Sequence, residues 1–266
     1  MRPPAVAGAF YPSSQSELSK LIDSCFTHKL GPKGDPKPLI GAVVPHAGYV
    51  YSGPGAAWVY HNLKAVKPCS VVLLGPNHTG YGNAVSASAQ DSWKTPLGEV
   101  QVDTKLRDKL AKLCDEIMVE DDAHSAEHSI EVQLPFLQTI WGNKFKIIPI
   151  CLGTQDPTIL KKLGESIGKL NTIVLASSDM SHYVPHATAS RLDHLAIEEI
   201  LKLDPAGLLK VVAKNDISMC GVAPAAAMLW ATGPRAKKAE LLQYYTSGDI
   251  SGDKSAVVGY GAIAVR

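Results

Sequence analysis

Three histidines, His46, His78 and His182, each come a few residues after an apolar run rich in β-branched residues. Such runs are typical of interior strands of a parallel sheet. Because ligands and catalytic groups collect at the carboxyl edge of such a sheet, we expect the three imidazoles to share one crevice. Imidazole binds metal ions and, with an ordinary pKa of about 6.5, transfers protons near neutral pH. A single loop histidine is ordinary, but three at equivalent strand ends favour a common site.

One of the five cysteines stands at the predicted beginning of a helix. Cys220 lies in the segment SMCGVAP, where free backbone N–H groups would favour a thiolate. A reactive thiol is one interpretation of this residue, and a buried, inert thiol is the other. The remaining four cysteines fall in apolar or helical contexts, so we expect them to be inert.

A second polar cluster, residues 122–133, precedes an apolar segment. Its Glu127, His128 and Glu131 could lie on the first turn of a helix, where carboxylates suit the helix dipole. A well-capped helix and a role in substrate contact both remain open for this cluster. His124 and His128 have i, i+4 spacing, yet the HExxH motif of zinc proteases is absent, which excludes that class.

The rest of the chain alternates strand and helix patterns, which predicts an α/β fold built in layers. We expect strands at 39–44, 70–74, 145–151 and 172–176, and helices at 14–26, 103–113, 187–203 and 222–230, with another that begins at Asp156-Pro157. The last ten residues before Arg266 read as one long strand or a hairpin. No repeat or long linker interrupts the pattern, so we expect a single domain over 1–266.

Composition narrows the function classes. The 266 residues include 26 basic and 25 acidic side chains, and a net charge of +1 argues against a nucleic-acid partner. The odd, scattered cysteines do not suggest a disulfide framework. The opening MRPPAVAGAFYP lacks the pattern of a signal peptide, and no apolar run approaches the roughly 18 residues of a membrane span. We therefore expect a cytoplasmic protein without a membrane partner.

Six motifs in order along the chain resemble the Memo family, also called the AmmeMemoRadiSam system protein B family. They are AGAFYP from Ala7, VPHAGYVYSG around His46, LLGPNHTGYG around His78, EHSIEVQLPFLQ from Glu127, SSDMSHY from Ser177, and MCGVAP around Cys220. That family is similar to the class III, LigB-type extradiol dioxygenases. The resemblance implies a three-layer αβα fold, with a mixed, mostly parallel central sheet flanked by helices.

The resemblance also implies a mononuclear metal site. His46 and His78 match the two histidine ligands of the dioxygenases, and Cys220 matches a cysteine that the Memo pattern places where the dioxygenases have a carboxylate. His182 matches the acid/base histidine, with Asp179 nearby to orient it. Fe(II) is the first expectation for the metal, while a thiolate ligand shifts preference toward Cu or Zn.

The function expected from this site is metal-dependent redox chemistry on a small substrate, with aromatic molecules among the candidates. The substrate would contact Tyr49, Tyr51, Asn77, Tyr81, His128 and Glu131. The alternative is a non-enzymatic adaptor that uses the same pocket for a phosphorylated or aromatic ligand, since some relatives are regarded as phosphotyrosine-peptide adaptors. A third interpretation, suggested by the family's system name, is an accessory partner of a radical enzyme. Fold alone does not decide among them.

Overall fold

The computed structural model describes residues 1–266, and four parallel strands form the centre of its sheet. They lie side by side in the order β1 (Gly41–Val44), β8 (Ile173–Ser177), β2 (Ser70–Pro76) and β7 (Lys146–Leu152). Nearly all of their residues are buried, because helices cover both faces. This explains why each strand is a continuous apolar run rather than an alternating one.

Antiparallel strands extend this parallel centre on both sides. On one side β11 (Val257–Val265) pairs with β1, while β10 (Ala239–Thr246) and β9 (His182–Val184) pair with β11. On the other side β3 (Val85–Ala87) is antiparallel to β7 and β6 (Met118–Val119) is parallel to β3. A hairpin of β4 (Ser92–Thr95) and β5 (Gly98–Val102) also joins β7 through β5.

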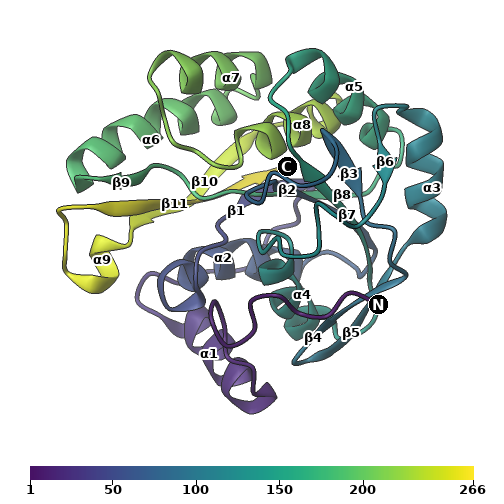
Figure 1. Ribbon diagram of the computed structural model, residues 1–266. Helices are drawn as coiled ribbons and strands as arrows, with labels where there is room; N and C mark the ends of the chain where they lie inside the picture. Colours follow the sequence, from purple (N-terminus) through teal and green to yellow (C-terminus); the bar gives the residue numbers. More distant parts are fainter.

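Helices form a layer on each face of the sheet (Figure 1). One layer contains α1 (Gln15–Thr27), α2 (Tyr49–Leu63) and α4 (Leu134–Trp141). The other contains α3 (Thr104–Leu113), α5 (Pro157–Gly168), α6 (His186–Leu201), α7 (Pro205–Lys214) and α8 (Val222–Thr232). Short turns η1 (Glu131–Gln133), η2 (Gly233–Arg235) and α9 (Gly248–Ser251) complete the chain.

Two apolar cores separate these layers from the sheet. In β2, Val72 and Leu74 belong to one core while Val71 and Leu73 belong to the other, because successive side chains of a strand point to opposite faces. The predicted α/β class, with a mixed, mostly parallel sheet between helices, is therefore confirmed. None of the helices is both long and apolar enough to cross a membrane.

Local signals located the four central strands, the last strand and five of the helices to within a few residues, but they did not predict α2, α4, α7 or the short strands β3–β6 and β9. The expected cap at Asp156 is present, since its carboxylate accepts a hydrogen bond from the amide of Thr158 at 2.8 Å. The helical turn expected to include Glu127 begins only at Glu131, as η1. Glu127 lies before that turn because its carboxylate accepts hydrogen bonds from His78, and this difference determines the geometry of the site.

Candidate metal centre

The ends of three neighbouring parallel strands place polar residues at one edge of the sheet. Val44 of β1 is level with Ser177 of β8, and Ala176 is level with Leu74 of β2. The segments that leave these strands therefore emerge together, and they contain His46, Asp179 and His78.

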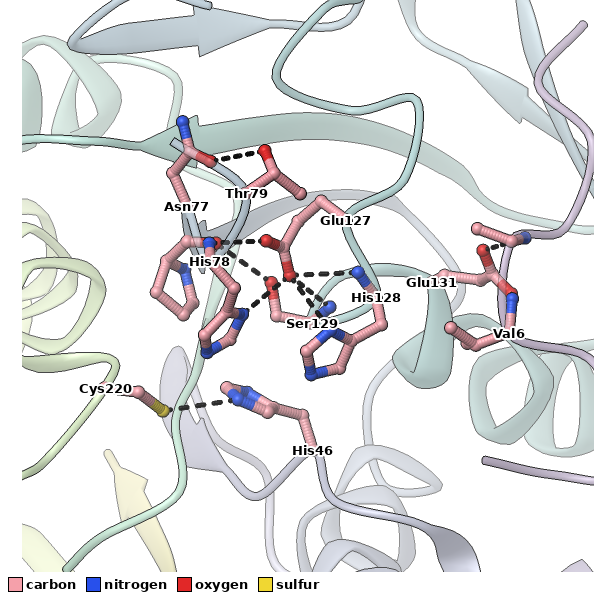
Figure 2. A network of polar contacts seen from close by, with 12 residues as sticks. Val6, His46, Asn77, His78, Thr79, Glu127, His128, Ser129, Glu131 and Cys220 are labelled. Atoms are coloured by element: carbon pink, nitrogen blue, oxygen red, sulfur yellow. Dashed lines mark hydrogen bonds and ion pairs between the residues drawn. The ribbon is translucent and has the colours of Figure 1, made fainter. Parts of the chain in front are cut away.

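A third histidine reaches the same place from a loop. His128 precedes η1, and its ring lies 4.6 Å from that of His78 and 5.4 Å from that of His46, measured between centroids. The His46 and His78 rings are 5.3 Å apart. One ligand atom from each of the three residues lies within 4.8 Å of the others, so the group could hold a metal ion. Figure 2 shows the three rings turned toward one another.

Ser177 fixes the tautomer of His46. The Ser177 hydroxyl donates its only proton to the carbonyl of Ser129 at 2.6 Å, so its oxygen must accept from Nδ1 of His46 at 2.9 Å. Gln133 donates to the same hydroxyl oxygen at 2.8 Å. With the proton on Nδ1, Nε2 of His46 keeps the lone pair that a metal ion needs.

Glu127 performs the same task for His78. Its buried carboxylate accepts from Nδ1 of His78 at 2.9 Å and from the His78 amide at 2.7 Å. The amides of His128 and Ser129 donate to it as well, both at 2.9 Å. Burial by itself raises the pKa of Glu127, but the hydrogen bonds from His78 and from the Ser129 amide oppose burial, and the pKa lies far below its usual range. A carboxylate that accepts from Nδ1 places the lone pair of the neutral His78 ring on Nε2, the atom free to bind an ion (Figure 2).

The chemistry of the three donors fits a metal ion. Burial lowers the pKa of His46, and the neighbouring His128 and His78 lower it further. Burial also lowers the pKa of His128, although Glu127 opposes the change. Both rings are therefore neutral near pH 7, which is the form that binds metal.

The structure corrects the expected ligand set of two histidines and one cysteine to three histidines. The sulfur of Cys220 lies 3.3 Å from Nε2 of His46, but Cys220 is not part of the metal-binding group, which consists of His46, His78 and His128. Its sulfur accepts a hydrogen bond from the Asp179 amide at 3.3 Å. Burial and the Asp179 carboxylate raise the pKa of Cys220, so this residue is a neutral thiol near pH 7 in the metal-free protein.

A cavity of about 650 Å³ adjoins the three histidines. Its floor is formed by the buried or half-buried His46, His78 and His128, and its rim includes exposed Tyr51 and Tyr183. Asp179, His182 and Phe10 also line it. The cavity is large enough for a small aromatic ligand that touches the histidines directly.

His182 and Asp179 both face this cavity but are held by different partners. Nδ1 of His182 lies 2.9 Å from the Ser218 carbonyl, which only accepts, so this nitrogen has the proton and Nε2 has the lone pair. Asp179 accepts from the His46 amide at 2.7 Å, and burial raises its pKa to about 6. The residue that orients the His182 ring is thus Ser218, while Asp179 fixes the backbone at His46.

Of the residues expected to contact substrate, Tyr51 and His128 line the cavity and four others do not. Tyr49 is buried, and its hydroxyl donates to the Val132 carbonyl. The Asn77 side chain accepts hydrogen bonds from Thr79 and Gly80 of its own loop, and the side chain of Tyr81 is exposed. Glu131 is fully buried against the N-terminal segment.

Sequence reasoning named His128 but gave it no role as a metal ligand. His128 does not come directly after a strand, so the strand-end argument that found His46 and His78 could not include it. The signal that was available is the neighbouring Glu127, a carboxylate next to a histidine in a motif of the Memo pattern. Ser177 lies in the SSDMSHY motif, but no pattern in the sequence predicts that it fixes the tautomer of His46.

The fold and the histidine group define an α/β protein with a candidate metal centre at the carboxyl edge of its sheet. Residues 2–264 match the family described as Memo-like protein, and the chain belongs to that family. It is 47% identical to a MEMO1 family protein of Methanopyrus kandleri, with 100% of this chain and 99% of that protein covered. A MEMO1 family protein of Methanocaldococcus jannaschii is 46% identical, with the same coverage. The expected family is therefore confirmed.

Among solved structures, the chain is similar in fold to an uncharacterized protein from Escherichia coli K12. The TM-score is 0.60 at 11% identity, and the match covers 85% of this chain and 99% of the other. At this identity the likeness concerns the fold alone.

Proposed function

We propose that His46, His78 and His128 bind one divalent transition metal ion and that the protein performs metal-dependent redox chemistry on a small molecule in the adjoining cavity. The observation that supports this most directly is the convergence of the three imidazoles, two of which have Nδ1 committed to a fixed acceptor. Such outer hydrogen bonds are the usual companions of metal-binding histidines.

Iron(II) is the metal we propose first, with copper and zinc as the competing ions. Neutral imidazole suits all three. Bound here, iron(II) would supply one-electron chemistry and reactivity with dioxygen. The cavity lies directly over the histidines, so a ligand has access to the metal position.

His182 is the group we propose for proton transfer. Its Nε2 has a lone pair because Nδ1 is committed to Ser218, so it can accept a proton from a hydroxyl of the ligand. Asp179 holds the backbone of His46 and, by its position on the cavity wall, adds negative charge near His182. Neither residue belongs to the histidine group itself.

Two alanine variants test this site against the ligand set expected from the resemblance. We expect wild type to bind one equivalent of Co²⁺ or Fe²⁺ under anaerobic conditions, and His128→Ala to lose more than about 100-fold in affinity, because a direct ligand should matter more than an outer partner. Cys220→Ala should stay within a few-fold of wild type. Calorimetric titration measures both. Loss of binding in Cys220→Ala with retention in His128→Ala would refute the three-histidine site.

The adaptor interpretation has less support from the cavity. A phosphate group is normally held by arginine or lysine. The cavity lining contains neither of these residues, and it does contain the carboxylates of Asp179 and Asp253. The partnership with a radical enzyme stays a proposal that genome context would test.

A further inference from the structure

Arg2 is a buried charged residue far from the histidines in sequence but joined to the loop that presents one of them. Only 4% of its surface is exposed. Its guanidinium donates to the carbonyl of His124 at 2.7 Å and to that of Glu127 at 2.6 Å. The guanidinium also lies 4.1 Å from the centre of a Trp93 ring. Arg2 thereby fixes the backbone directly before His128.

Glu131 is the carboxylate partner of Arg2, and it accepts several other hydrogen bonds. Its buried carboxylate pairs with Nη1 of Arg2 at 2.6 Å and accepts from the Tyr11 hydroxyl at 2.5 Å. The amides of Ala5 and Val6 donate to it at 2.7 and 3.1 Å. Glu131 thus fastens residues 2–11, here called the N-terminal strap, to the first turn after His128 (Figure 2).

The strap also touches the histidine site itself. The Phe10 ring lies 4.5 Å from the His128 ring, between centroids, and Phe10 lines the cavity. The Phe10 carbonyl accepts from the amide of Tyr49, which begins α2 three residues after His46. The strap therefore contacts the segments of two of the three histidines.

We propose that Arg2 and Glu131 are positioning residues of the metal centre, which hold the loop of His128 and the Phe10 wall in the geometry that binds the ion. This inference rests on the proposed function for its metal readout, and it extends that function to a segment that lies outside the histidine group. The buried charge pair is suited to the task because neither partner is stable alone in an apolar setting. Removal of Arg2 leaves the Glu131 carboxylate without its counter-charge and frees two loop carbonyls at once.

Arg266 provides a matched control. It too makes one ion pair, with Glu240 at 3.1 Å, and donates to two carbonyls, those of Lys37 and Pro38 at 2.6 and 2.7 Å. These contacts join the end of β11 to the segment before β1, at the edge of the sheet opposite the histidines. Arg2→Met and Arg266→Met therefore remove similar interactions at two different places.

Two measurements on the full chain test the proposal, well below the melting temperature of each variant. In Co²⁺ titrations we expect Arg2→Met to bind at least about 10-fold more weakly than wild type, Arg2→Lys to recover part of the loss, and Arg266→Met to match wild type. In hydrogen exchange, amides of residues 124–131 should exchange faster in Arg2→Met and not in Arg266→Met. If Arg2→Met does not fold, Glu131→Gln serves, since it keeps the shape and removes the charge.

A role in stability alone would lower the melting temperature of Arg2→Met and leave its Co²⁺ affinity at the wild-type value, which would overturn the proposal. Adding Arg2→Met to His128→Ala should cause no further loss of affinity, and an independent loss would also overturn it. If wild type binds no metal, the proposed function fails and hydrogen exchange alone decides. Unchanged exchange at residues 124–131 would then refute the strap's positioning role, and faster exchange would support it.

Discussion

Glu127 joins two of the three histidines through a single carboxylate. One oxygen accepts from Nδ1 of His78 and from the amides of His128 and Ser129, and the other accepts from the His78 amide. All of these partners are donors, so a carboxylate satisfies them and a carboxamide does not.

We therefore expect Glu127→Gln to weaken Co²⁺ binding by about 10- to 100-fold, the range seen for outer-shell partners of metal-binding histidines. The amide NH₂ would face at least one N–H donor and turn His78 away from its position. Calorimetric titration measures the loss. Glu165→Gln, on the exposed face of α5, is the control and should bind like wild type. Wild-type affinity in Glu127→Gln would show that this carboxylate does not orient the ligands.

His124 supplies a pH dependence of stability that is separate from the metal ligands. It is 1% exposed, its Nε2 donates to the Ser86 carbonyl, and its Nδ1 has no partner. Burial lowers the pKa of His124 from 6.5 to about 4. The unfolded chain therefore binds a proton that the folded chain refuses between these two pH values, so stability falls as the pH is lowered from about 6.5 through about 4.

The expected contribution of His124 to this loss is up to about 3 kcal/mol. In His124→Gln, which can still donate to Ser86, this part of the pH dependence should vanish. Urea unfolding of both proteins at about pH 7.5 and about pH 4.5 measures the two free energies of unfolding. The free energy of the variant relative to wild type should be higher at the lower pH. A difference in free energy of unfolding between the two proteins that is the same at both pH values would contradict the assignment to His124.

At the scale of elements, the close approach of β2 to the loop of His128 depends on a glycine. A methyl carbon at Gly75 would lie 2.5 Å from Oγ of Ser129 and 2.7 Å from Cγ1 of Ile130. The side chains of Ser129 and Ile130, directly after His128, therefore pack on the backbone of Gly75. We expect Gly75→Ala to cost about 1–3 kcal/mol of stability, typical of overpacking, and to weaken Co²⁺ binding by shifting this loop.

Thermal unfolding and calorimetric titration measure the two effects of Gly75→Ala. Gly233→Ala is the matched control, because no atom lies within 4 Å of the added methyl at that position. If Gly75→Ala lost stability without any loss of metal affinity, the loop would not depend on β2 for its position.

The elements that sequence reasoning located are those with a local cause. Each central strand is a continuous apolar run, and α5 begins at a capping aspartate followed by proline. The convergence of His46 and His78 also follows, because β1 and β2 end at the same edge of the sheet on either side of β8. The place of His128 does not follow, because it is set by Arg2, Glu127 and Glu131 through contacts that span 49 to 129 residues of chain. Such contacts leave no periodic pattern in the sequence.

At the scale of the whole molecule, the cavity joins distant parts of the chain. The residues that line it include Phe10 of the N-terminal strap, Tyr183 of β9 and Asp253 of the turn between α9 and β11. Tyr183 has a left-handed backbone with φ of 57°, which is rare for a residue of its size, and it is 79% exposed. Because strained residues collect at functional sites, this rim tyrosine is a candidate for ligand contact.

The charges of the cavity predict which ligands it prefers. Asp253 at the exposed rim has its pKa lowered by hydrogen bonds from Ser255, so it is ionised at neutral pH, and the lining has no lysine or arginine. Exposed Tyr51 and Tyr183 offer aromatic faces beside it. A carboxylate with aromatic rings attracts a cation, so a small aromatic ligand with an amine should bind better than one with a carboxylate.

Tyramine and 4-hydroxyphenylacetate share a phenol and differ in the charge of the other end, which makes them suitable probes. With metal-free protein we expect tyramine to bind roughly 4- to 25-fold more tightly, since one exposed ion pair and one cation–π contact each contribute a factor of about 2 to 5 in affinity. Asp253→Asn should reduce this preference and Asp253→Lys should reverse it. Ligand-observed NMR titration measures both dissociation constants. Tighter binding of the carboxylate by wild type would mean that the floor histidines, and not the rim, determine the charge that this cavity selects.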